Sequence, residues 1–448
     1  MPSIDLDVVI VGAGATGLAA LAELDGAGRR VLCFEARDRI GGRVLTVRDP
    51  LCPIPIELGA EFVHGRPPEI WDIIKSGRLT AYDCAARAVH LKDGKPKHDH
   101  DAWKSVDRVM TDMQRSASQH EDRTFASFLE LSPYPEDAKR LATSYVEGFN
   151  AAKKEVVGIA SLAEDAMAAD EIDGDRSFRI LNGYDSVLAQ LLNSIGESET
   201  KLRLNSIIER IEWKCGAAAV YARSTLTGAV ETVRSRRVII TVPLGVLQAA
   251  PDSPGSIRFE PEPTEVLTAA RALRFGHVIR LVLRFREAFW ESNGEISGAG
   301  FLLSDERLFP TWWTSLPVHA PLLTGWSAGP HADDLLGKPQ STIVSEAIAT
   351  LARITACPRE RLTGLLEAGY SHDWHGDPFV RGAYSYVPAG ALAARKTLAQ
   401  PVADTLYFAG EATNLDGHSA TVHGAIASGQ RAAQQCIAVS ERVNNKSV

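Results

Sequence analysis

Cysteine is scarce in this sequence and long apolar runs are missing, and both features narrow the class of protein. The 448 residues include six cysteines, none of them in a CxxC pair. Their dispersal predicts reduced, mostly buried thiols, and indicates neither a disulfide framework nor a metal site. No apolar stretch reaches the ~20 residues that span a bilayer, and the final "AVSERVNNKSV" is polar. We therefore expect a protein that is not anchored in a membrane.

An excess of basic residues is also missing. The formal net charge is −8, which argues against nonspecific binding of nucleic acid. Because the first apolar segment begins near Asp5, we expect no signal peptide and a cytoplasmic location. The length exceeds what one hydrophobic core usually serves, so we expect two domains.

Glycine, by contrast, is concentrated near the start of the chain. In "DLDVVIVGAGATGLAALAEL" an apolar run over 8–11 leads into Gly12, Gly14 and Gly17, spaced as GxGxxG. The first glycine permits a tight turn, the second lets the backbone approach a pyrophosphate, and the third lets helix and strand pack closely. The helix start then presents unpaired N–H groups to phosphate. This pattern predicts a dinucleotide site.

Two further features fit the same site. A second strand, "RVLCFEAR", ends on Glu35, where an acid is expected to bind ribose hydroxyls. Directly after it, "EARDRIGGRV" places Gly41, Gly42 and Arg43. A flexible glycine pair followed by a guanidinium suits a second approach to the pyrophosphate.

Together with these motifs, later blocks resemble the flavin-containing amine oxidase family, which includes monoamine, polyamine and histone-demethylase-type oxidases. The blocks occur in family order: "ELGAEFVHG", "LNGYDSVLAQLL", "VIITVPLGVLQ", "DPFVRGAYSYVPAG" and "YFAGEAT…ATVHGA". The resemblance implies FAD as the cofactor. It also implies an α/β fold, in which a Rossmann-like FAD-binding domain with a parallel sheet is interleaved with an α+β substrate-binding domain.

The two domains are expected to be discontinuous. We assign residues 1–85, 178–250 and 389–448 to the FAD-binding domain, and residues 86–177 and 251–388 to the substrate-binding domain. Residues 86–177 show the apolar periodicity of helices, and strands return over about 200–242.

The resemblance assigns contacts with FAD to a set of residues spread over the chain. Glu411 ends a late strand and matches the family acid that hydrogen-bonds the ribityl chain. The full set is Gly12, Gly14, Gly17, Glu35, Arg37, Gly42, Arg43, Gly59, Ala60, Ile208, Pro243, Gly410, Glu411, Thr421 and Val422.

The last helix is expected to lie with its positive end under the N1–C2=O edge of the flavin. Ser419 is the expected cap of this helix, with Thr421 and Val422 nearest to the flavin. For His423 we favour capping or packing over proton transfer. Residue 383 is Ala, where monoamine oxidases carry the cysteine that bonds to the flavin, so FAD should be held noncovalently.

Four positions match the family's catalytic positions. Tyr384 matches one aromatic residue of the substrate cage, Thr421 replaces the second, and Trp374 matches a tryptophan near the flavin face. Arg280 stands where the family has a lysine that reaches flavin N5 through a water. It either lies with Arg284 on a solvated face or lies in the cleft, at that water or against an anionic substrate group, and we favour the cleft. Arginine keeps its proton and is not equivalent to lysine.

Two further residues are expected at the inner end of a substrate tunnel. Glu61 either contacts a polyamine or makes a structural hydrogen bond to backbone, and His64 is expected to contact substrate. Trp312 and Trp313 could line the cleft, although we expect core packing for at least one of them. The acidic residues over 170–175 are expected on an exposed loop.

The favoured function is oxidation of a C–N bond in a polyamine or other secondary or primary amine. The resemblance implies hydride transfer to flavin N5, with O2 reduced to H2O2. The alternatives are an oxidase or dehydrogenase of an amino acid or acidic amine, and a flavin-binding scaffold with impaired turnover. A histone-demethylase role is disfavoured, because no long helical-hairpin insertion is apparent. We expect a monomer or homodimer.

Overall fold

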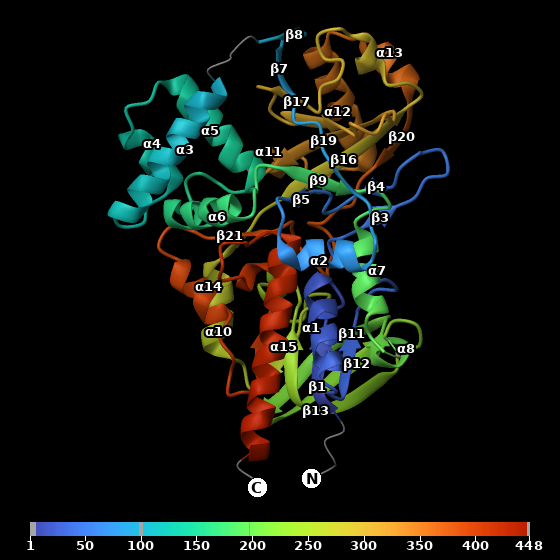
Figure 1. Ribbon diagram of the computed structural model, residues 1–448, viewed down its shortest axis with the longest axis vertical. Helices are drawn as coiled ribbons and strands as arrows, with labels where there is room; N and C mark the ends of the chain where they lie inside the picture. Colours follow the sequence, from blue (N-terminus) through green and yellow to red (C-terminus); the bar gives the residue numbers. More distant parts are fainter. Residues whose placement is uncertain (1–5, 98–101, 197, 446–448) are drawn as a thin grey trace.

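Two large sheets and a layer of helices organise the chain (Figure 1). The structure is a computed structural model and describes residues 6–97, 102–196 and 198–445. In the first sheet the strand order is β10-β2-β1-β13-β12-β11-β14, and β22 pairs with β13. The bounds are β1 (Leu6–Val11), β2 (Val31–Phe34), β10 (Leu202–Arg203), β11 (Ser206–Lys214), β12 (Ala217–Ser224), β13 (Val230–Ile240), β14 (Arg258–Glu260) and β22 (Leu406–Phe408).

The strands that come from the two ends of the chain, β1 and β22, both pair in parallel with β13. β1 pairs in parallel with β2 and β13, and β13 pairs in parallel with β22, so that Ile240 lies opposite Phe408. Their apolar runs are buried, as parallel strands covered on both faces require. The sheet also takes in β14, which lies beyond residue 250, the expected end of the second FAD-domain segment.

Helices α1 (Ala15–Gly26) and α15 (Val422–Asn445) lie side by side along this sheet (Figure 1). Their close approach requires a small residue. A Cβ built on Gly429 of α15 would lie 2.2 Å from the carbonyl oxygen of Thr16 in α1. The last helix of the chain is therefore fixed against the first one.

The second sheet has the order β20-β16-β19-β18-β17-β7-β8. Its strands are β7 (Ala88–Lys92), β8 (Lys95–Pro96), β16 (Val278–Phe285), β17 (Phe301–Ser304), β18 (Thr311–Thr314), β19 (Leu322–Ala328) and β20 (Leu366–Tyr370). Every residue of β16 is buried, and Leu281, Leu283 and Phe285 pack in a core with α12 (Gln340–Thr355). The hairpin over 88–96 corrects the expectation of helix from residue 86 onward.

A layer of four helices follows that hairpin, as α3 (Ala102–Gln119), α4 (Phe125–Leu131), α5 (Glu136–Phe149) and α6 (Ile159–Glu171). The layer has its own core around Val109, Phe125 and Val146. It is tied to the second sheet by Trp326, whose Nε1 donates a hydrogen bond to the carbonyl oxygen of Gly148, 2.9 Å away.

The remaining elements are short. They are β3 (Thr46–Val47), β4 (Ile56–Glu57), β5 (Val63–His64), α2 (Pro68–Ser76), β6 (Ala81–Asp83), β9 (Ser177–Ile180), α7 (Asp185–Asn193), α8 (Ser198–Lys201), α9 (Leu244–Leu247), α10 (Thr264–Ala272), β15 (Arg274–Phe275), η1 (Phe289–Ser292), α11 (Pro330–Asp333), α13 (Arg359–Leu365), β21 (Ser385–Tyr386), α14 (Leu392–Leu398) and η2 (Glu411–Thr413). Strands β5, β9 and β6 form a small sheet in the middle of the molecule (Figure 1).

The thiols and the helix lengths bear on two expectations. All six cysteines are free, but only Cys33 and Cys436 are buried and Cys215 is exposed, so that the expectation of mostly buried thiols is wrong. Within the described residues, no helix combines the length and apolarity needed to cross a bilayer. That same part of the chain contains no cluster of His, Cys, Asp and Glu arranged to hold a metal ion.

Candidate active site

One cavity of about 1070 Å³ runs from the glycine turn after β1 to the second sheet and the helical layer. It brings together every residue proposed above for cofactor, catalysis or substrate, with the exception of Gly17. Those lining it are Gly12, Gly14, Glu35, Arg37, Gly42, Arg43, Gly59, Ala60, Glu61, His64, Ile208, Pro243, Arg280, Trp374, Tyr384, Gly410, Glu411, Thr421 and Val422.

Gly17 has a packing role instead. A Cβ at this position would lie 1.8 Å from the carbonyl oxygen of Gly12, so any larger residue would push α1 away from the turn. Gly12 itself has φ +103, a backbone conformation that L residues rarely adopt. Both glycines therefore determine the shape of the turn, and neither supplies a side-chain contact to a ligand in the cavity.

The beginning of α1 is open toward the cavity. Gly14 is the N-cap residue and supplies no side-chain hydrogen bond, so the first N–H groups of the helix keep their capacity to bind an anion. Gly14 forms a β-bridge with Gly41, and a Cβ on Gly14 would meet no other atom nearer than 4.0 Å. The two glycine motifs thus form one surface on which a pyrophosphate can lie.

Glu35 is buried at the end of β2. Its Oε2 accepts a hydrogen bond from the backbone N–H of Ala13 at 2.8 Å, and its Oε1 accepts one from the backbone N–H of Arg37 at 3.0 Å. Each oxygen keeps a further acceptor site, so the carboxylate can also receive two ribose hydroxyls. The Arg37 side chain is held by Asp377, with 2.6 Å between Nη2 and Oδ2.

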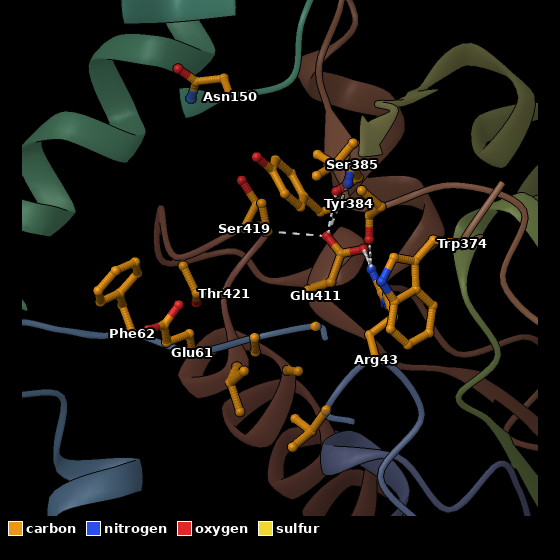
Figure 2. Close-up of a pocket in the computed structure, with 18 of the residues that line it drawn as sticks. Arg43, Glu61, Phe62, Asn150, Trp374, Tyr384, Ser385, Glu411, Ser419 and Thr421 are labelled. Carbon is orange, nitrogen blue, oxygen red and sulfur yellow. Dashed lines mark hydrogen bonds and ion pairs between the residues drawn. The ribbon is translucent and has the colours of Figure 1, made fainter. Parts of the chain in front are cut away.

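Glu411 connects three distant segments (Figure 2). Its Oε1 lies 2.8 Å from Nη1 of Arg43, and its Oε2 accepts hydrogen bonds from the Ser385 hydroxyl at 2.6 Å and the Ala420 N–H at 3.2 Å. Arg43 also donates to the carbonyl oxygen of Ala383 at 2.7 Å. The carboxylate that ends the late strand therefore joins the second glycine motif to the "AYS" segment.

The start of α15 differs from expectation. Thr421, not Ser419, caps the helix, because its Oγ1 accepts a hydrogen bond from the backbone N–H of Gly424 at 3.0 Å. The Ser419 hydroxyl instead donates to Oδ1 of Asp165 at 3.1 Å. The helix begins at Val422, three residues after Ser419, so Thr421 is the residue that immediately precedes it.

His423 is 3% exposed and borders the same cavity. Its ring packs edge-on against His418, with 4.8 Å between ring centroids, and its Nε2 has no hydrogen-bond partner within the described structure. Burial, with smaller effects of His418 and His64, lowers the pKa of His423 to about 3. The imidazole is therefore neutral at physiological pH, and packing is the role that its surroundings support.

Glu61 lines the cavity and forms the centre of a buried ionic network. Its carboxylate is paired with the guanidinium groups of both Arg179 and Arg280, and it accepts a hydrogen bond from Trp313 Nε1 at 2.9 Å. Burial alone would raise the pKa of Glu61, but the two guanidinium groups outweigh it and lower the value to about 2. Glu61 is thus a structural carboxylate whose partners are side chains, not backbone.

Arg280 is fixed from three sides. Its Nε donates to the carbonyl oxygen of Glu57 at 2.6 Å, Nη2 pairs with Glu61, and the guanidinium lies 5.3 Å from the ring centroid of Trp313. The side chain is 4% exposed. The solvated-face interpretation is therefore wrong for Arg280. It is also wrong for Arg284, because this side chain is only 9% exposed and pairs with Asp49 and Glu367. Arg179 is not among the residues predicted for the site, because the sequence marks it only by its place in the short strand β9.

The aromatic positions are held by backbone hydrogen bonds. The Tyr384 hydroxyl donates to the carbonyl oxygen of Phe149 at 2.8 Å, and Trp374 Nε1 donates to that of Leu58 at 2.9 Å. Tyr384 and Thr421 border one open space in Figure 2, with Glu61 and Phe62 beyond Thr421. Trp312 is fully buried in the core, whereas Trp313 lines the cavity, which confirms core packing for one of the pair.

The family model for flavin containing amine oxidoreductases matches residues 15–437. The chain belongs to this family. The residues present fit FAD, because the open helix start can take the pyrophosphate and Glu35 keeps acceptor sites for a ribose. The expected fold class and the FAD cofactor are thereby confirmed.

The individual relatives have low sequence identity to this chain. Lysine-specific histone demethylase 1 homolog 1 of Oryza sativa subsp. japonica is 28% identical over 97% of this chain and 52% of its own length. Polyamine oxidase 5 of the same plant is 26% identical over 96% of this chain and 87% of its own length. The chain spans about half or less of the first three curated relatives that it matches, all of them demethylases or demethylase-like proteins.

Solved structures share the fold at low identity. Putrescine oxidase bound to putrescine superposes with a TM-score of 0.80 at 22% identity, covering 97% of this chain and 99% of that one. This likeness concerns the fold only.

Proposed function

We propose that this chain is an FAD-dependent amine oxidase that converts an amine to an imine. The α-carbon gives up a hydrogen with two electrons, and the nitrogen gives up a proton. Bound FAD supplies the acceptor for the hydride, and O2 then takes the two electrons to form H2O2. The observation that carries the proposal is the single cavity joining the FAD cradle to an aromatic substrate end.

The chain's own residues provide the conditions that this oxidation needs. Phe62, Trp313 and Trp326 form an apolar wall that keeps water from the reacting carbon. The phenol of Tyr384 is anchored to the helical layer, so its ring is fixed at the border of the cavity. Trp374 is fixed in the same way on Leu58.

The buried ionic network also favours the reactive form of the substrate. Two guanidinium groups share one carboxylate, so the group formed by Glu61, Arg179 and Arg280 carries a net charge of +1. A positive charge nearby disfavours a bound ammonium and favours the neutral amine. Only the neutral amine has the lone pair from which an imine can form.

The alternative of an acidic substrate is not supported by the site. It required Arg280 to bind a substrate carboxylate, but that guanidinium is already engaged by Glu61 and the backbone of Glu57. The contact expected between Glu61 and a polyamine meets the same obstacle, because this carboxylate is paired twice.

The test is anaerobic mixing of the FAD-loaded protein with monoamines, polyamines and amino acids in turn, followed by flavin absorbance. Bleaching by amines is the expected result. Retention of oxidised flavin with every amine, with FAD shown to be bound, would overturn the proposal in favour of a flavin-binding scaffold. Faster bleaching by amino acids would instead support the acidic-substrate alternative.

A further inference from the structure

Several aromatic side chains line the substrate end of the cavity. Phe62 lies 5.5 Å from Trp313 and 6.3 Å from Phe301 between ring centroids, and Trp313 lies 5.6 Å from Trp326. Phe149 borders the same space and is 53% exposed, an unusual state for a large apolar side chain. An apolar surface left open inside a cavity indicates a ligand with an apolar body.

The charges beside these rings have the wrong sign for a second ammonium group. Glu61 is neutralised by Arg179 and Arg280, which leaves one guanidinium in excess, with Arg280 directly against Trp313. The nearby Glu57 carboxyl offsets this charge only in part, because burial raises its pKa to about 7. His64 adds no charge of either sign, because burial lowers the pKa of its imidazole to about 4 and leaves it neutral.

The other carboxylates that line the cavity are also accounted for. Glu35 and Glu411 lie in the FAD-binding part and are bonded as described above. Asp305 pairs with Arg140 at 2.5 Å, and Asp165 accepts a hydrogen bond from Ser419 and lies 3.6 Å from Arg395. Asp175 is exposed to solvent. Among the described lining residues, no buried carboxylate is left without a partner for a second substrate cation.

Resting on the proposed function, we infer that the site selects amines with a single cationic centre on an apolar or aromatic body, and discriminates against diamines and polyamines. An apolar body gains free energy from burial against the aromatic wall. A second ammonium would lose its hydration beside a net positive group, which is unfavourable without a paired anion. The specificity thus follows from the two guanidinium groups as much as from the rings.

The test compares n-hexylamine with 1,6-diaminohexane, which have the same chain length and differ in the second amino group. The dependence of the anaerobic flavin-bleaching rate on amine concentration gives the second-order rate constant of flavin reduction, without a contribution from O2. We expect n-hexylamine to exceed 1,6-diaminohexane by about 100-fold or more, as like-charge repulsion in a dry site predicts. Phenethylamine should be at least as good as n-hexylamine, and spermidine should resemble the diamine.

The variant Arg179→Gln tests the cause. It removes one guanidinium from Glu61 and should narrow the preference for n-hexylamine by about tenfold or more, because the network then carries no net positive charge. Arg176→Gln is the matched control, since Arg176 is exposed three residues earlier and pairs with Asp83. A preference that is unchanged in Arg179→Gln would contradict the assigned cause.

The ratio of the reduction rates with n-hexylamine and 1,6-diaminohexane in the wild-type protein tests the inference even if Arg179→Gln does not fold. Turnover of 1,6-diaminohexane equal to or faster than that of n-hexylamine would overturn the inference while leaving the amine oxidase function intact. Absence of bleaching by all four amines would instead overturn the proposed function.

Discussion

Arg280 and Glu61 form a buried ion pair, and this pairing prevents the substrate contacts that their positions in the sequence suggest. Neither group is free to bind an oppositely charged part of a substrate. Together with Arg179 they form a fixed electrostatic element behind the aromatic wall. Removal of one partner from such a network leaves a buried charge uncompensated, which is costly.

The first prediction concerns Arg280→Lys. A lysine cannot reproduce the planar set of bonds to Glu57, Gly59 and Glu61. We expect the free energy of unfolding to fall by about 2–4 kcal/mol, measured by urea denaturation. Arg286→Lys is the control, because Arg286 is exposed and its nearest carboxylate contact is 3.9 Å long. An equal effect of the two variants would contradict the assignment of Arg280 to a buried network.

The second prediction uses two glycines of one helix. Gly17→Ala places a Cβ against the carbonyl oxygen of Gly12, whereas a Cβ at Gly26 has nothing within 4 Å. Gly17→Ala should weaken FAD binding by tenfold or more, on the order expected when the turn that holds the phosphates is displaced. Gly26→Ala should bind FAD as the wild type does. Fluorescence titration of the apoprotein with FAD distinguishes them, and normal affinity in Gly17→Ala would refute this account of the turn.

The third prediction is that FAD is bound without a covalent link. Ala383 offers no thiol, and the one cysteine among the described cavity residues is Cys84. Burial raises the pKa of Cys84 to about 12, so its thiol stays protonated and a poor nucleophile. Precipitation of the protein with acid should release all flavin into the supernatant. Yellow colour retained in the washed pellet would show the prediction to be wrong.

The fourth prediction is a pH dependence due to His423. Because its pKa is about 3 in the folded protein, against 6.5 in the unfolded chain, the unfolded state binds more protons between these values. Stability from this residue is therefore present above about pH 6.5 and is lost as the pH falls. From pH 7 to pH 5 the loss is about 2 kcal/mol.

The test of this dependence is urea unfolding of wild type and His423→Gln at both pH values, with FAD saturating. His423→Gln should lose less stability on acidification than the wild type. His120→Gln, at an exposed position, should follow the wild type. Parallel behaviour of all three proteins would exclude His423 as the source.

Local features of the sequence were sufficient for the nucleotide-binding half. Glycine spacing, an apolar strand and the acid at the end of the next strand are short-range patterns, and their geometry is set by neighbouring residues. Predictions that rested on the periodicity of a segment or on the type of a single residue were less reliable. The hairpin over 88–96 lies within a segment predicted as helical, because its first strand, β7, is specified by pairing with β17, more than 200 residues later. Ser419 and Thr421 are both acceptable caps by residue type, and only the course of the backbone distinguishes them.

The sequence by itself determined the family, the cofactor and the set of residues around one cavity, because each motif is a short contiguous stretch whose residue types follow from backbone geometry and hydrogen bonding. Only the tertiary structure decided the state of those residues. The charge that a substrate meets depends on Arg179 and Arg280, which lie on strands of two different sheets and reach Glu61 from positions 118 and 219 residues away. No local pattern predicts that these three side chains meet, because their contact depends on how the sheet of β9 and the sheet of β16 pack around the cavity.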